Sequence, residues 1–112
     1  MQAEDRVRLQ HMAEAAQAAQ RFMINRDRVD LDRDQMLLFA VVRAIEIVGE
    51  AAARVSPQTR AATSEIPWQA IVGMRNRVVH AYFSIDCEVV WKTVSVELPQ
   101  LLAALHAALS AR

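Results

Sequence analysis

Apolar residues recur along this chain at intervals of three and four, the spacing that places side chains on one face of an α-helix. In the first segment, from Ala3 to about Asn25, this stripe is formed by Val7, Met12, Ala16, Ala19 and Met23. The chain then turns strongly polar up to Asp34. That change predicts a helix end and a connection, with Asp30 or Asp32 as the N-cap of the next helix.

The second segment, from about Asp32 to Val55, carries apolar residues on an unusually wide arc. One row consists of Leu37, Val41, Ala44, Val48, Ala52 and Val55, and a second row beside it consists of Met36, Ala40, Ile47 and Ala51. Such an arc predicts burial on more than one side. The helix is therefore either central in a small bundle or in contact with a second subunit, and the pattern leaves both arrangements open.

The rest of the chain carries several helix start signals. Ser56 and Pro57 predict a short helical connection over 57–62. A third helix is expected from about Pro67 to His80, and a fourth begins after the N-cap Asp86, with Pro99 predicting a kink or break inside it. Four principal helices with short connections predict an all-α, up-and-down four-helix bundle with one short extra helical connection, as a single domain over 1–112.

Composition supports helices and limits the classes of function. The chain has 112 residues, 20 of them alanine, with only two glycines and three prolines, too few for the turns of a many-stranded sheet. The net charge is zero, so no global basic field indicates a nucleic-acid binder. No signal pattern opens the chain, and its longest apolar run, Met36 to Val42, is too short to cross a bilayer. We therefore expect a cytoplasmic protein, in which the single cysteine, Cys87, is a buried thiol.

One window of the sequence is locally basic. No acidic residue lies between Glu65 and Asp86, and this window contains Arg75, Asn76, Arg77, His80 and Tyr82. On an ideal helix the side chains of Asn76 and His80 lie roughly 40° apart, whereas those of Arg75 and His80 point about 140° apart. A second copy of the helix across a two-fold axis would bring two arginines and two histidines together, so the spacing favours a dimeric site.

These residue types suit cleavage of RNA without a metal or cofactor. Histidine exchanges a proton near neutral pH, arginine offers forked donors to phosphate oxygens, and asparagine can orient either partner. A base would deprotonate the ribose 2′-hydroxyl, arginine would stabilise charge developing on the phosphate, and an acid would protonate the leaving oxygen. DNA lacks that internal nucleophile, so the expected substrate is RNA.

Plainer interpretations compete with a catalytic one. An arginine, an asparagine and a histidine on one helix are more often surface residues or hydrogen-bond partners between helices. Glu46 and Glu50, four residues apart, could form half of a carboxylate metal site, but the partner Glu-x-x-His pattern is absent. Ion pairs with Arg43 and Arg54, three or four residues away, are the better interpretation. The alternatives to an enzyme are a non-catalytic nucleotide-binding or partner-binding module and a structural oligomerisation bundle.

Several motifs in order resemble the HepT toxins of the HEPN superfamily, over roughly 35–109. The core of the resemblance is the Arg-Asn-x-x-x-His-x-Tyr pattern of Arg75, Asn76, His80 and Tyr82. The flanking motifs are Gly49-Glu50-Ala51, Ile66-Pro67-Trp68, Ile71-Val72-Gly73-Met74, Val90-Trp91-Lys92-Thr93 and Glu97-Leu98-Pro99. Ala81 stands where many relatives carry glycine, which would stiffen the end of the helix.

The resemblance implies a HEPN-like bundle acting as a homodimer, with metal-independent endoribonuclease activity that arrests growth. Arg75 and His80 match the catalytic pair of the family, Asn76 matches the polar residue after the arginine, and Arg77 is the expected supporting contact to RNA. The implied partner, in a homodimer or a larger hetero-complex, is an antitoxin of the minimal nucleotidyltransferase (MNT) type. In such toxin-antitoxin systems it adds AMP to the tyrosine matching Tyr82, placing bulk and negative charge where the substrate phosphate would bind.

Overall fold

The computed structural model describes residues 1–78 and 84–111, and the regular elements of these residues are all helical, which confirms the all-α class. The helices up to the basic window are α1 (Ala3–Phe22), α2 (Arg28–Arg33), α3 (Gln35–Ala53), α4 (Pro57–Ala62), α5 (Trp68–Val72) and α6 (Met74–Val78). They are followed by α7 (Cys87–Lys92), the π-helical segment η1 (Thr93–Glu97) and α8 (Leu98–Ser110). Among the described residues, no helix is both long and apolar enough to cross a membrane.

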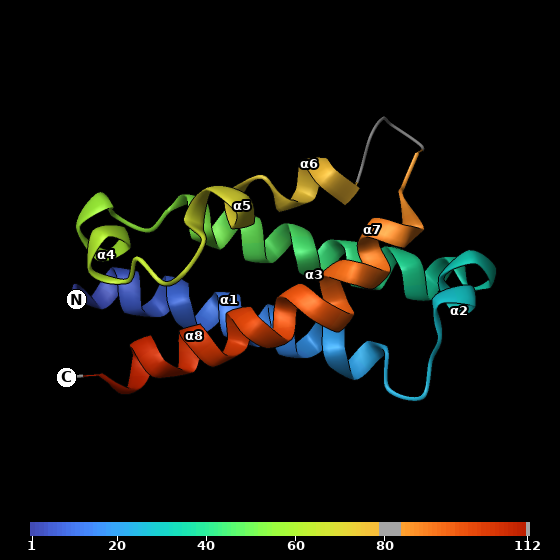
Figure 1. Cartoon of the computed structure of the whole chain (residues 1–112), viewed down its shortest axis with the longest axis horizontal. Helices are drawn as coiled ribbons and strands as arrows, with labels where there is room; N and C mark the ends of the chain where they lie inside the picture. The colour runs from blue at the N-terminus through green and yellow to red at the C-terminus, as the bar shows by residue number, and fades with distance from the viewer. Residues whose placement is uncertain (79–83, 112) are drawn as a thin grey trace.

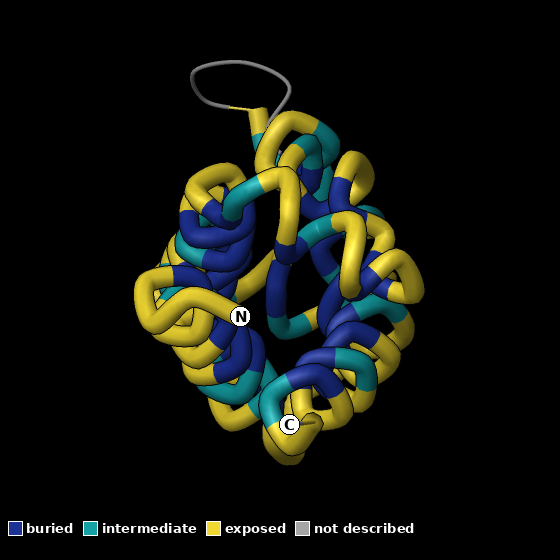
Figure 2. Tube along the Cα trace, turned by 90° about the vertical axis from the view of Figure 1, so that its left-hand side faces the viewer, coloured by how far each residue is buried: buried dark blue, intermediate teal, exposed yellow. Residues whose placement is uncertain are grey.

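The long helices run side by side along an elongated molecule of 44 × 28 × 19 Å. Helix α1 packs antiparallel against α3 along most of its length, and α8 returns beside α1 so that both chain ends lie at the same end of the molecule (Figure 1). Helices α5 and α6 lie on α3, and α7 packs against α2. Buried positions line the inward faces of these helices, with exposed positions outside (Figure 2).

The expected continuous helix over 67–80 is divided into two short helices, which departs from a regular four-helix bundle. Helix α5 ends at Val72, Gly73 forms its C-cap, and α6 starts at Met74 and ends at Val78. Glycine is a poor residue for a helix interior, and here the Gly73 carbonyl accepts a hydrogen bond from the N–H of Asn76, three residues on. The last two residues of the predicted helix, 79 and 80, lie outside the described residues.

The predicted N-caps were correct at two helix starts and wrong at a third, where several aspartates follow one another in the sequence. Ser56 accepts from the N–H of Thr59 at the start of α4, and Asp86 accepts from the N–H of Val89 at the start of α7, as expected. The prediction of Asp30 or Asp32 as the cap of α3 was wrong, because Asp34 caps α3. The polar run instead forms α2, which Leu31 anchors in the core with 1% of its surface exposed.

The helical regularity changes over the five residues that come shortly before Pro99, where a kink or a break was predicted. Regular α-helix ends at Lys92, the chain continues as the π-helical η1, and α8 begins at Leu98 with the proline in its first turn. The backbone is helical from Lys92 through Leu98, and the N–H of Leu98 donates to the Thr93 carbonyl, so the proline, which has no N–H to donate, stands directly after the widened turn. The π-helical segment thus precedes the proline. Its last residue, Glu97, lies against α6 and pairs with Arg77.

Candidate active site

Helix α6 carries three consecutive polar residues of the basic window, two of them on its outer side. Met74 and Val78, four residues apart, are almost completely buried and fasten the helix to the core. Because side chains four apart lie on one face, the intervening Arg75 and Asn76 are directed outward and are exposed. Arg77 lies between these two environments and is half-buried.

Arg75 is held by an acid from another helix. Its Nε donates to Oε2 of Glu46 on α3 over 3.2 Å, and its Nη1 lies 3.5 Å from Oδ1 of Asn76. The side chain of Glu46 is 25% exposed and that of Arg75 is 54% exposed. The carboxylate is therefore the more enclosed partner, and the far edge of the guanidinium faces solvent.

Arg77 makes a different set of contacts, which tie α6 to η1. Its Nη1 lies 3.1 Å from Oε1 of Glu97, and its Nη2 donates to the carbonyl oxygen of Ala70 over 3.4 Å. The Oγ1 of Thr93 also donates to Glu97, over 3.4 Å. These contacts occupy the guanidinium of Arg77 in joining helices, so the RNA contact expected of this residue stays a prediction.

The surface around Arg75 and Arg77 carries less net positive charge than the basic window of the sequence suggested, because two carboxylates lie against it. Glu46 and Glu97 are distant in sequence from the basic window, yet each carboxylate meets one of its arginines. The predicted pairing of Glu46 with a neighbouring arginine on its own helix was wrong, and Glu50 pairs with Arg43 rather than with Arg54. No local pattern in the sequence indicates the contact of Glu46 with Arg75, because the two residues lie on different helices.

His80 and Tyr82, the other two predicted site residues, lie outside the described residues. The described residues on either side of them are in contact, since the N–H of Asp86 donates to the carbonyl oxygen of Val78 over 2.8 Å. The end of α6 and the start of α7 are therefore held together. The 140° separation expected between Arg75 and His80 on one helix stays a prediction.

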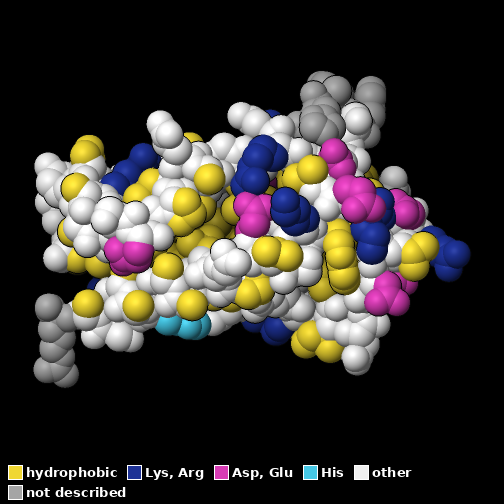
Figure 3. Space-filling model, viewed as in Figure 1, with side chains coloured by type: hydrophobic (Ala, Val, Ile, Leu, Met, Phe, Trp, Pro, Cys, Tyr) yellow, Lys and Arg dark blue, Asp and Glu magenta, His cyan; other side chains and the backbone are white. Residues whose placement is uncertain are grey.

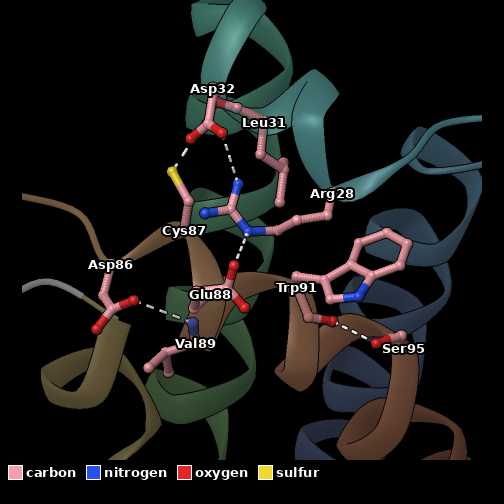
Figure 4. Close-up of polar contacts among 9 residues, drawn as sticks. All are labelled: Arg28, Leu31, Asp32, Asp86, Cys87, Glu88, Val89, Trp91 and Ser95. Atoms are coloured by element: carbon pink, nitrogen blue, oxygen red, sulfur yellow. Dashed lines mark hydrogen bonds and ion pairs between the residues drawn. The ribbon is translucent and has the colours of Figure 1, made fainter.

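The start of α7 is fastened to α2 by a charged cluster (Figure 4). Arg28 lies between two carboxylates, 2.9 Å from Oδ2 of Asp32 and 2.7 Å from Oε1 of Glu88. Burial raises the pKa of the neighbouring Cys87 thiol, and its bond to Asp32 raises that pKa further. A thiol with a raised pKa stays protonated at neutral pH and is a poor nucleophile, but Cys87 is half-buried and not the buried thiol that was predicted.

Two of the hollows among the described residues lie along α3 and α5. One, of about 240 Å³, lies between α5 and α8 and is lined by Ile71, Met74, Glu97 and Leu101, among others. Figure 3 shows hydrophobic side chains gathered there. The other, of about 500 Å³, lies between α1 and α3 and includes Arg8 and Arg43. Within residues 1–78 and 84–111, no group of three or more His, Cys, Asp or Glu side chains is placed to hold a metal ion.

Comparison with known proteins places this chain in a family. The family model described as "Ribonuclease HepT-like" matches residues 12–108, a span that includes the whole basic window. The chain belongs to the HepT-like ribonuclease family. The match leaves out only the first eleven and the last four residues of this HepT-like chain. The family resemblance seen in the motifs is therefore confirmed.

Relatives of this HepT-like chain carry names of the same kind. A protein of Thermococcus cleftensis named "Probable ribonuclease HepT" is 38% identical over 83% of this chain and 84% of its own length. A "Putative RNase" of Methanocaldococcus jannaschii is 33% identical over 83% of this chain and 85% of its own. Another, from Caldanaerobacter subterraneus, is 38% identical over 64% of each chain. A search of the solved structures gave no match.

Proposed function

We propose that this protein is a metal-independent endoribonuclease, the toxin of a toxin-antitoxin pair, with Arg75 and His80 as its catalytic residues. The observation that carries the proposal is the HepT-like family match, which spans the Arg-Asn-x-x-x-His-x-Tyr pattern. Arg75 supports it, because the helix that bears it is anchored by two buried residues while the guanidinium faces outward.

In the proposed reaction the chain supplies a base, an acid and a fixed positive charge. His80 takes the proton of a ribose 2′-hydroxyl, whose oxygen attacks the adjacent phosphorus. The bond to the 5′-oxygen breaks, and that oxygen takes a proton from an acid, the second histidine of a dimer. Arg75 donates to the phosphate oxygens as charge develops on them, Asn76 orients the arginine or the phosphate, and Arg77 is a supporting RNA contact.

The proposal includes a homodimer of up-and-down bundles with a composite site. Met36 and Phe39 on α3 are exposed by 82% and 53%, although both are large and apolar. Seven residues on a helix turn through close to two full turns, so Phe39 and Glu46 differ by roughly 20° around α3. Met36, Phe39 and Glu46 thus form one stripe along α3, and Arg75 lies beside this stripe because it pairs with Glu46. A second copy packed on this stripe would bring two arginines near one another.

Cleavage of a labelled RNA oligonucleotide in EDTA tests the activity. The expected products end in a 2′,3′-cyclic phosphate and a 5′-hydroxyl, and a substrate with 2′-deoxyribose at the cleaved position stays intact. Arg75→Ala and His80→Ala each lower the rate by about 100-fold or more. Intact RNA with wild-type protein, together with binding of a protein partner, would instead support the non-catalytic binding module.

The proposed regulation has its own test. Co-expression with an MNT-type nucleotidyltransferase antitoxin encoded beside this chain should add the mass of one or more AMP units to the protein. We expect that gain to be absent in Tyr82→Phe, and the modified protein to cleave RNA more slowly than the unmodified one. An unchanged mass, or a gain that persists in Tyr82→Phe, contradicts modification of this tyrosine.

A further inference from the structure

Glu46 holds the arginine of the proposed site at one edge only. It receives the Nε–H of Arg75, while Nη1 is near Asn76 and the remaining N–H groups have no acceptor among the described residues. A guanidinium binds a phosphate through two parallel N–H groups of one edge. The pair with Glu46 therefore fixes the plane of the guanidinium and leaves donors for a phosphate.

The environment of Glu46 suits an anchoring role. It is in the middle of α3, the helix that packs against α1, α5 and α6, and the neighbouring Ile45 is completely buried. Its side chain is half as exposed as that of Arg75, 25% against 54%. An enclosed carboxylate on a rigid helix limits the rotamers of the more exposed arginine, which would otherwise sample many positions in water.

The same helix provides a comparison one turn further along. Glu50 also forms an ion pair across 3.0 Å, but with Arg43, and both side chains of that pair are 59% exposed. The two glutamates share a helix and a charge, and both are paired with an arginine. They differ in the partner, since Glu46 is paired with an arginine of α6 and Glu50 with an arginine of its own helix.

From this geometry we infer that Glu46 is a positioning residue, which orients the Arg75 guanidinium toward the phosphate of a bound RNA. The inference rests on the proposed function, because it assigns Glu46 a role through Arg75. A carboxylate this close to an anion-binding arginine also repels phosphate, so removal of its charge should leave substrate binding no weaker while the reaction slows.

The test compares Glu46→Gln with Glu50→Gln in steady-state cleavage of an RNA oligonucleotide. We expect Glu46→Gln to lower kcat about tenfold with KM unchanged or lower, and Glu50→Gln to stay within about twofold of wild type. In an Arg75→Lys background the effect of Glu46→Gln should fall below about twofold, because lysine has no guanidinium plane to orient. Equal rates for the two glutamine variants, a faster Glu46→Gln enzyme, or an undiminished effect in the Arg75→Lys background would each overturn the inference.

A second measurement does not depend on cleavage. The NMR signal of the Arg75 Nε–H, assigned by its loss in Arg75→Lys, should exchange slowly in wild type and in Glu50→Gln and faster in Glu46→Gln. An unaltered signal in Glu46→Gln also overturns the inference. If Arg75→Ala and His80→Ala cleave RNA as fast as wild type, the proposed function fails instead, whatever the behaviour of Glu46.

Discussion

Arg75 and Arg77 are two residues apart, yet their charges are met in different ways. Arg75 reaches Glu46 on α3 and keeps more than half of its side-chain surface exposed, whereas Arg77 is joined to Glu97 and to a backbone carbonyl. The Nε of Arg77 is buried without a hydrogen-bond partner among the described residues. Of the two, Arg75 is therefore the better placed to meet an external anion, while the contacts of Arg77 in the free protein connect α6 to α5 and η1.

The role of Arg77 gives a prediction about stability. The variants Arg77→Gln, Glu97→Gln and the double variant form a double-mutant cycle, which measures the coupling between the two side chains. We expect this coupling to contribute about 0.5 to 1 kcal/mol to the free energy of unfolding, because the pair is only partly exposed. Urea denaturation measures it. The same cycle on Arg43 and Glu50, both more exposed, should give a coupling near zero. If the losses of stability in the two single variants simply add up in the double variant, the ion pair of Arg77 with Glu97 does not stabilise the fold.

Asp5 gives a prediction about pH. Its buried carboxylate accepts from Ser56 N–H, Ser56 Oγ and Thr59 Oγ1 at 3.0, 2.5 and 2.6 Å, and these bonds lower its pKa below the ordinary 3.8. A carboxylate whose pKa is lower in the folded than in the unfolded protein stabilises the fold. This stabilisation is complete at pH values above the pKa of the unfolded state and is lost as the pH falls through the pKa of the folded state. At neutral pH we expect Asp5→Asn to cost about 1 to 3 kcal/mol.

Urea denaturation of wild type and Asp5→Asn between pH 7 and pH 2 measures this cost. The difference in unfolding free energy should be constant above about pH 5 and shrink below 3.8. Glu4→Gln is the matched control, since Glu4 is in the same first turn of α1 but is exposed. A pH-independent difference for Asp5→Asn would show that its charge contributes nothing.

At the scale of elements, the two glycines do different things. A Cβ at Gly49 on α3 would lie 3.3 Å from the Ile71 carbonyl oxygen and 3.6 Å from that of Val72, so the absence of a side chain lets the end of α5 approach α3. At Gly73 the nearest atom, the Gln69 carbonyl oxygen, is 3.4 Å away, an ordinary contact. Gly49 thus controls packing, and Gly73 marks the break between α5 and α6.

Substitution of each glycine by alanine separates these roles. Gly49→Ala should lower stability by about 1 to 2 kcal/mol, because the backbone of α5 must move and this outweighs the gain in helix propensity. Gly73→Ala should be neutral or stabilise by up to about 1 kcal/mol, since its φ of −82° suits any residue. Thermal unfolding of both variants is the check, and a Gly49→Ala protein as stable as Gly73→Ala would contradict the close approach.

At the scale of the whole molecule, the outer side of α3 combines an apolar ridge with the Arg75 contact. Met36 and Phe39 are exposed near the start of this helix, and Glu46 follows further along it. Apolar side chains of this size on one helix face are typical of an interface. Met36, one of the surplus apolar positions noted in the sequence, therefore belongs to surface that the single chain leaves uncovered, together with Phe39.

The assembly can be tested by substitution on this ridge. Wild-type protein should sediment as a dimer, and Phe39→Lys should sediment as a monomer at the same concentration, with RNA cleavage lost because the composite site is divided. Val96→Lys on η1 is the control, since Val96 is also apolar and is 46% exposed. A dimeric Phe39→Lys protein, or equal dissociation in both variants, would contradict an interface on this side of α3.

The sequence alone determined the helical class, the approximate extent of α1, α3 and α4, and the caps Ser56 and Asp86, because periodicity and capping act over a few neighbouring residues. It also indicated the family, through a motif whose residues are close together in the chain. Only the tertiary structure decided which acid meets each arginine and where the expected third helix divides. Those outcomes depend on contacts between distant segments, such as Glu46 with Arg75, and no local pattern in the sequence specifies such a contact.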